Sequence, residues 1–324
     1  MRAQAFSTEN GYMRFQGLVA LMVVGTLTLL APVAQAATDD RGQLIQPQDG
    51  ARKVVAISTF AADTLVALGV APAGASTFGD RPTPDFLGPL MEGVPSLGQR
   101  ASTNLELLSA LQPDLILAIR RYTEPSAQKL SALAPFYAFD VISHDDSLRA
   151  VAGIATALGK AAEGQALNAD FEALVDDFGR RAPGGISAVL LAGSGEAPFA
   201  YYDHFLTTDL LRRLQATNSI GPSPTPEQAV PFGFQLSLEQ LLALNPDVIF
   251  MFASSTRHAY AANPVWPYLK AVQQGRVYEV GLHWKEGGGP IAREYILREM
   301  AWRLYPETFS QPQLPASLAS RLFH

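Results

Sequence analysis

One segment of the sequence occurs twice, and this repeat constrains the fold more than any other feature. Residues 104–116 read NLELLSALQPDLI and residues 237–249 read SLEQLLALNPDVI, so that the copies lie 133 positions apart and align without a gap. A repeat of this kind indicates a structural unit that the chain builds more than once. The simplest interpretation is two lobes of similar design, and a chance match of two short segments is the alternative.

Each copy predicts a helix, a turn and a strand, in that order. A favourable N-cap residue opens each copy, and Glu106 or Glu239 falls in the first helical turn, where a negative charge suits the helix dipole. A proline disfavours helix in the residue before it, so the helices should end near Gln112 and Asn245. A short apolar strand follows the Pro-Asp pair in both copies.

Strands and helices alternate along the rest of the chain. The expected strands are 53–57, 74–77, 94–97, 115–119 and 136–141 in the first half, and 187–192, 248–252 and 276–280 in the second. The expected helices include 60–68, 206–214 and 291–304. Because such alternation implies parallel sheets, we predict an α/β protein with two Rossmann-like lobes joined by a single long connecting helix.

The segment between the two halves predicts a stiff connection. Residues 148–181 contain no proline, and apolar side chains recur at helical spacing after residue 161. A flexible linker would be rich in Gly, Ser or Pro, so we expect one continuous helix here. The expected divisions are a signal peptide at 1–36, an N-terminal lobe at 50–145, a connector at 146–182 and a C-terminal lobe at 183–324, with 50–310 together forming one binding domain.

The first 36 residues predict a secretory signal peptide. Arg2 and Arg14 precede the apolar run 18–31, and Ala34 and Ala36 form an A-x-A cleavage site. The run is shorter than the roughly 20 residues that a membrane span needs, although an N-terminal anchor is the alternative. We expect cleavage after Ala36 and a mature protein in the periplasm, without lipid because the chain has no cysteine.

Composition and motifs argue against several other classes. A formal net charge of −6 argues against a nucleic-acid partner, since such proteins present a basic face. The absence of cysteine leaves no thiolate metal site, Cys nucleophile or iron–sulfur cluster. Ser194 lacks the G-x-S-x-G frame of a hydrolase, so no enzyme is expected. The three glycines at 287–289 precede a helix that could receive an anion, but a flexible turn is the simpler interpretation.

Together these features resemble the periplasmic substrate-binding proteins of ABC importers, in the group that serves ferric siderophores, ferric citrate, haem and vitamin B12. The resemblance rests on VVAIS at 54–58, VPSLG at 94–98, the two repeat motifs and GRVY at 275–278. It implies a monomer that captures a ferric siderophore between two lobes and delivers it to an inner-membrane ABC permease with its ATPase. The ferric chelate is then the transported ligand, and no resident cofactor or metal is expected. Haem, cobalamin or a bare metal ion are alternative ligands, and a secreted α/β hydrolase is a remote alternative.

The resemblance also assigns roles to acidic residues. In that family an acidic residue near the start of each paired helix docks into arginine pockets on the permease, and the matching residues here are Glu106 and Glu239. Both would otherwise be ordinary first-turn glutamates. Relatives often carry a glutamate in the first helix, where this chain has Asp63, so the resemblance leaves the role of Asp63 open.

Ligands of open α/β sheets lie outside the carboxyl ends of the strands, and this rule selects loops without reference to any family. These loops are rich in Arg, Tyr, Trp and His, a mixture that suits a bulky, oxygen-rich and partly anionic iron chelate. The candidates are Arg81, Arg100, Arg121, Tyr122, Tyr201, Tyr202, His204, Arg257, Tyr260 and Trp284. The leading cations are Arg81, Arg100 and Arg121; the resemblance makes Trp284 the leading aromatic, and Lys285 shares its loop.

Three histidines provide the only basis for direct metal binding. His204, His258 and His283 fall on expected loops of the second lobe, where imidazoles could ligate a metal ion. The first lobe offers no matching histidine, because its only one, His144, lies near the connector. The sequence therefore favours contacts to a chelate over contacts to the metal itself.

Overall fold

The computed structural model describes residues 37–77, 85–254, 256–285, 287–315 and 318–323. The expected signal peptide and Arg81 lie outside these residues. Among the described helices, none combines the length and the apolar character that a membrane crossing requires.

The N-terminal sheet, in the N-lobe, consists of five parallel strands in the order β3-β2-β1-β4-β5. The strands are β1 (Val54–Ile57), β2 (Gly74–Thr77), β3 (Ser96–Gln99), β4 (Leu115–Ile119) and β5 (Phe136–Phe139). The helices between them are α1 (Thr59–Ala67), α2 (Leu105–Leu111), α3 (Arg120–Thr123) and α4 (Ala127–Ser131). The parallel sheet predicted for this half is confirmed.

The second sheet, in the C-lobe, has the order β12-β11-β10-β6-β7-β9, with β8 also paired to β6. Its strands are β6 (Ser187–Ala192), β7 (Phe199–Tyr201), β8 (Thr217–Asn218), β9 (Gly233–Gln235), β10 (Val248–Phe252), β11 (Val277–Val280) and β12 (Arg321–Leu322). The helices of this lobe are α7 (Leu206–Arg213), α8 (Leu238–Leu244), α9 (Lys270–Gln273) and α10 (Pro290–Leu304). Only β6, β8, β10 and β11 pair in parallel, whereas β7, β9 and β12 pair antiparallel. The segment 193–198 between β6 and β7 is too short for the crossover that a parallel pair needs.

The repeated segment forms equivalent units in the two lobes, as predicted. The side chains of Asn104 and Ser237 cap α2 and α8 by accepting hydrogen bonds from the backbone N–H groups of Leu107 and Gln240. Both helices end in left-handed residues, Gln112 with φ 50° and Asn245 with φ 44°. The strands β4 and β10 follow at once and lie in the interior of their sheets.

The aspartate of each Pro-Asp pair fastens its strand to the start of the neighbouring one. The Oδ2 atom of Asp114 accepts the N–H groups of Lys53 (2.9 Å) and Arg52 (2.8 Å), just before β1, and these bonds hold the pKa of Asp114 below its usual value. The Oδ2 atom of Asp247 accepts the N–H and the hydroxyl of Ser187, both at 2.8 Å, at the start of β6. The repeat therefore encodes a strand-pairing device as well as a helix.

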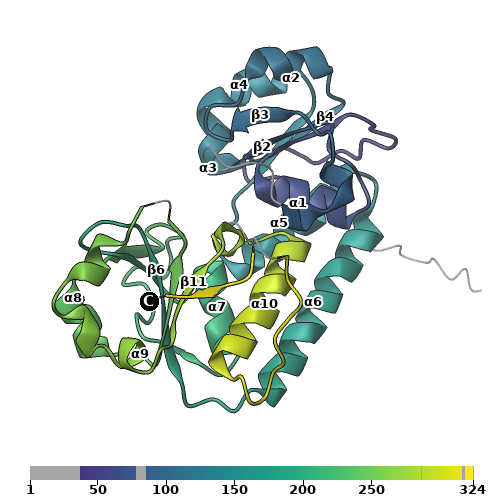
Figure 1. The fold of residues 1–324 in the computed structure, drawn as a ribbon. Coiled ribbons are helices and arrows are strands. Elements are labelled where there is room, and N and C mark those ends of the chain that lie inside the picture. Colours follow the sequence, from purple (N-terminus) through teal and green to yellow (C-terminus); the bar gives the residue numbers. More distant parts are fainter. Residues whose placement is uncertain (1–36, 78–84, 255, 286, 316–317, 324) are drawn as a thin grey trace, which may run out of the picture. The chain divides into compact units, whose positions relative to one another are not determined.

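The connector differs from the expected continuous helix. It consists of α5 (His144–Ala157) and α6 (Ala161–Arg181), which pack against each other after a break at 158–160. Gly159 lies in the break with φ 68°, and a Cβ atom there would come within 2.2 Å of the Asp49 carboxylate, so the chain turns at a glycine. A single long helix, α6, remains, and Figure 1 shows it beside α10.

The inner faces of the two sheets contribute to one continuous hydrophobic core. Alternate residues of β1 and β4 point into this core with α1 and α5, as do alternate residues of β6 and β10 with α7 and α10. The opposite faces are covered separately, by α2 and α4 in the N-lobe and by α8 and α9 in the C-lobe. Both lobes therefore bury apolar surface against shared helices.

We expect Asp247→Ala to lower the free energy of unfolding by about 1–3 kcal/mol, because the N–H of Ser187 at the start of β6 loses its acceptor. Asp247→Asn should cost less, since its carbonyl oxygen can still accept. Urea denaturation measures the stability of both variants, with Asp176→Ala on the exposed face of α6 as the control. An Asp247→Ala midpoint equal to that of the control would refute the strand-pairing role.

Candidate ligand-binding site

Loops at the carboxyl ends of the parallel strands bring together cations from both lobes. Arg100 directly follows β3, and Arg121 and Tyr122 lie on α3, which begins directly after β4. Lys285 comes from the C-lobe, after β11 and the short 3-10 helix Leu282–Trp284. We call Arg100, Arg121, Tyr122 and Lys285 the cation–tyrosine cluster.

The ring of Tyr122 is the centre of this cluster. The Cζ atom of Arg100 lies 3.7 Å from the ring centroid, and the Cζ atom of Arg121 lies 4.8 Å from it. Arg100 is only 5% exposed, and its guanidinium stacks on the Tyr122 ring. The Lys285 ammonium interacts electrostatically with Tyr122 and with both arginines.

The pKa values of these groups reflect burial first and the charges of their neighbours second. Burial lowers the pKa of Arg100 to about 10. Burial also lowers the pKa of Lys285, and the guanidinium groups of Arg100 and Arg121 add smaller effects in the same direction. Burial alone would raise the pKa of Tyr122, but Arg121, Arg100 and Lys285 bring it below its usual value. A bound anion would relieve this like-charge repulsion.

The two adjacent arginines of α3 have different partners. Arg120 forms an ion pair with Asp140, with its Nε 2.8 Å from Oδ2, and is thereby held at the end of β5. Arg121 instead lies against Tyr122, with its Nη1 3.4 Å from the carbonyl oxygen of Val141. Arg120 is therefore engaged by a carboxylate of the protein, and Arg121 stays the candidate for the ligand.

Tyr201, Tyr202 and His204 follow β6 in the chain, but Tyr201 is the last residue of β7, which runs back antiparallel to β6, and so does not lie in the expected loop. The three residues also differ in exposure. Tyr201 is 3% exposed and stacks on Phe205 with ring centroids 4.4 Å apart. Burial and, secondarily, the Tyr122 phenol raise the pKa of Tyr201. Tyr202 is buried against Phe234, and His204 is half-buried, with Nε2 3.4 Å from the carbonyl oxygen of Ala229.

Trp284 and Tyr260 lie in the core, contrary to the expectation that they face a ligand. Trp284 is fully buried, and its Nε1–H donates to Oε2 of Glu299 on α10 over 2.9 Å. Tyr260 is also fully buried and packs on Trp266. Arg257, in contrast, is exposed.

The three histidines do not form a metal site. His258 is buried between the carbonyl oxygen of Gly193 and the carboxylate of Glu279. Burial lowers the pKa of His283 to about 3, so its imidazole is neutral at ordinary pH. Over the described part of the chain, no group of three or more His, Cys, Asp or Glu residues could hold a metal ion.

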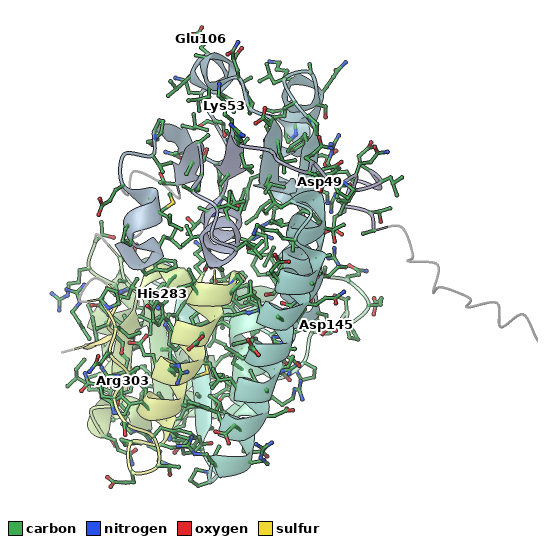
Figure 2. The ribbon with its side chains drawn as sticks, turned by 90° about the vertical axis from the view of Figure 1, so that its right-hand side faces the viewer. Asp49, Lys53, Glu106, Asp145, His283 and Arg303 are labelled. Carbon is green, nitrogen blue, oxygen red and sulfur yellow. The ribbon has the colours of Figure 1, made fainter. Side chains whose placement is uncertain are left out.

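The two glutamates expected to dock lie at the surface. Glu106 and Glu239 are exposed in the first turns of α2 and α8, and neither forms an ion pair with another described residue. Figure 2 shows Glu106 at the periphery of the N-lobe. Their equivalent positions follow from the repeat.

Residues 54–281 match the family described as periplasmic binding protein. The chain belongs to this family. As a periplasmic binding protein, it is similar to the "Probable siderophore-binding lipoprotein YfiY" of Bacillus subtilis, with 28% identity over 269 residues, covering 77% of this chain and 81% of that protein. It is also similar to the Fe(3+)-citrate-binding protein YfmC of Bacillus subtilis, with 26% identity over 266 residues, covering 78% of this chain and 81% of that protein.

A solved structure shares the fold of this periplasmic binding protein. It is the triscatecholate siderophore binding protein FeuA from Bacillus subtilis, complexed with ferri-bacillibactin, with a TM-score of 0.68 and 22% identity. The match covers 82% of this chain and 96% of that one. The two-lobe architecture predicted from the repeat is thereby confirmed.

Sequence reasoning ranked two residues of this periplasmic binding protein too low. Lys285 was only a neighbour of the favoured Trp284, yet it is Lys285 that interacts with Tyr122, Arg100 and Arg121. Asp63 was left without a role, yet it is buried and bonds to the C-lobe. The sequence did contain an indication for Lys285, namely a positive charge directly after Trp284 in the same expected ligand loop.

We expect Trp284→Phe to lower the free energy of unfolding by about 1–3 kcal/mol, because a buried oxygen of Glu299 loses its donor. Trp302→Phe is the matched control, since Trp302 lies on α10, as Glu299 does, but is only half-buried. Chemical denaturation measures both variants. Equal losses would mean that the indole–carboxylate bond contributes nothing specific.

Proposed function

We propose that this protein captures a ferric siderophore between its two lobes and delivers it to an inner-membrane ABC permease for iron uptake. The observation that carries the proposal is the cation–tyrosine cluster, in which both lobes present side chains at the carboxyl ends of their strands. Membership of the periplasmic binding protein family and relatives named for a siderophore and for Fe(3+)-citrate support it.

The charge of the cluster favours an anionic chelate. Guanidinium groups donate paired hydrogen bonds to carboxylate oxygens, and three cations together suit a ligand with several such oxygens. The Tyr122 ring adds a rigid apolar surface with a polar tip. A ferric complex of the citrate type therefore fits the site better than a neutral hydroxamate complex.

The same charge distribution supports binding rather than catalysis. Like-charged groups around a ring can hold an anion, but they provide no nucleophile with an adjacent base. The relatives are named as binding proteins. In the proposed role, iron stays in its chelator and the protein contacts the chelator's oxygens.

The proposed route begins with export. The signal peptide at 1–36, with cleavage after Ala36, would bring the protein to the periplasm. Two relatives, YhfQ and YfiY of Bacillus subtilis, are named lipoproteins. That the mature chain lacks a lipid anchor remains a prediction from its lack of cysteine.

Replacing any one cation of the cluster should weaken the binding of ferric citrate about tenfold, because a charge-assisted contact is lost. The variants are Arg100→Gln, Arg121→Gln and Lys285→Gln, measured by isothermal titration calorimetry. Arg180→Gln is the control, since this arginine pairs with Asp177 on α6.

A hydroxamate chelate, haem and cobalamin complete the ligand panel. Tight binding of haem or cobalamin with no response to ferric chelates would reject the siderophore assignment. Ferric citrate binding that all three cluster variants retain would reject the site.

Delivery requires a surface that the permease recognises, and Glu106 and Glu239 supply matched charges for it. The repeat places one exposed carboxylate on each lobe, at the first turn of a capped helix. Paired acidic groups suit basic pockets on two halves of a membrane partner. We therefore assign these residues to docking and not to the ligand.

The double variant Glu106→Ala, Glu239→Ala should retain ferric citrate affinity but lose iron uptake in cells, because only the contact to the permease is removed. Glu163→Ala on α6 serves as the exposed control. Growth on the ferric chelate as sole iron source provides the readout. Normal growth of the double variant would eliminate the docking role.

A further inference from the structure

The helix that carries Arg121 and Tyr122 is too short to hold itself in place. α3 has four residues, and none of the described side chains caps its N-terminus at Ile119. A single helical turn is unstable on its own, because it fixes several residues for one hydrogen bond. Within α3, the hydroxyl of the buried Thr123 donates to the carbonyl oxygen of Ile119 over 3.1 Å. The directions of Arg121 and Tyr122 therefore depend on contacts that other parts of the chain make to α3.

The first residue of α3 makes the strongest of these contacts. Nε and Nη2 of Arg120 both donate to Oδ2 of Asp140, over 2.8 and 2.5 Å. The pair is partly buried, with 38% of the Arg120 side chain and 18% of the Asp140 side chain exposed. Two N–H groups on one carboxylate oxygen fix the angle of the guanidinium as well as its distance. Because Asp140 directly follows β5, the pair ties the start of α3 to the end of the neighbouring strand.

Asp140 is itself held from two other elements. In the segment before β1, Asp40 accepts the N–H of Asp140 at its Oδ2 over 2.6 Å and donates its own N–H to the carbonyl oxygen of Ala138 over 3.1 Å. The other carboxylate oxygen of Asp40 accepts from Arg149 on α5 over 2.6 Å. Arg149 also pairs with Asp146, at 2.8 Å, in the capping box of α5. The position of Asp140 is therefore fixed independently of its bond to Arg120.

A weaker contact reaches the other end of α3. Nε of Arg41 lies 3.9 Å from Oε2 of Glu124, the residue directly after α3, and the Arg41 guanidinium lies over the Phe136 ring of β5, 4.8 Å from its centroid. The Glu124 side chain is 52% exposed, and an exposed ion pair at this distance contributes little. The bond between Asp140 and Arg120 is therefore the contact that decides how α3 lies.

We propose that Asp140 is a positioning residue of the ligand site: by holding Arg120, it keeps α3 in the orientation that gathers Arg121 and Tyr122 into the cation–tyrosine cluster. The two adjacent arginines then divide the work, since Arg120 anchors the helix and Arg121 serves the ligand. The effect on ligand affinity rests on the proposed function, whereas the hold of Asp140 on α3 does not.

The sign of the effect separates positioning from charge. If Asp140 acted only as a negative charge, its removal would strengthen the binding of an anion. Positioning predicts the opposite: Asp140→Asn should weaken the binding of ferric citrate about fivefold, because Arg121 is no longer held. Isothermal titration calorimetry at about 0.3 M salt, where distant charges are screened, measures the change. The matched control is Asp209→Asn, which removes a similar partly buried pair with Arg213 on α7 and should bind like the parent.

Two further readouts would not respond to a merely structural role in the same way. In the Arg121→Gln background, Asp140→Asn should weaken ferric citrate binding by less than about twofold more, because the cation that it positions is gone. Without ligand, hydrogen exchange measured by mass spectrometry over residues 119–124 should be about tenfold faster in Asp140→Asn and parent-like in Asp209→Asn. If ferric citrate does not bind the parent, the proposed function fails, and the exchange measurement still decides whether Asp140 holds α3.

Unchanged or stronger binding of ferric citrate by Asp140→Asn would overturn the positioning role. So would losses that multiply fully with Arg121→Gln, or parent-like exchange over residues 119–124. If Asp140→Asn fails to fold, Arg120→Lys takes its place, because it keeps both charges but loses the pair of N–H groups on one oxygen. That variant should bind ferric citrate about threefold more weakly, and parent-like affinity would then refute the role.

Discussion

The carboxylate of Asp63 at the first turn of α10 is the contact on which the arrangement of the two sheets depends. It joins Asp63 to Ile291 and Ala292, which lie 228 and 229 positions further along the chain, and each of its two oxygens accepts a hydrogen bond. Neighbouring features serve the same contact: Gly289 leaves room for it, Ser147 fixes the adjoining carbonyl group, and Arg293 ties α10 to the connector. Because the inner faces of both sheets pack around these helices, the joint between the lobes belongs to the core.

Local rules explain why the sequence predicts the repeated units so well. N-caps, a proline after the helix and a short apolar strand act over a few residues, and both copies follow them. The break between α5 and α6 depends instead on the approach of Asp49 to Gly159, which no window of the sequence reveals. The edge strands β9 and β12 likewise form only because partners elsewhere in the chain are available.

At the site, the sequence locates the loops but not the direction of each side chain. The strand-end rule brings Arg100, Arg121 and Tyr122 together as expected. In the loop after β11, however, the buried Glu299 of α10 bonds to the indole of Trp284, and so Lys285 is the residue left to interact with the cluster. A polar partner inside the core thus determines which of two neighbours interacts with Tyr122 and the two arginines.

The continuous core has a consequence for how the molecule melts. Two lobes with separate interiors could unfold one after the other, as independent domains do. Here α1, α5, α7 and α10 bury apolar side chains in one cluster. Unfolding of either sheet would therefore expose the apolar inner face of the other to water. The halves, although built from a duplicated pattern, are therefore thermodynamically inseparable, and neither is expected to persist as a stable fragment without the other.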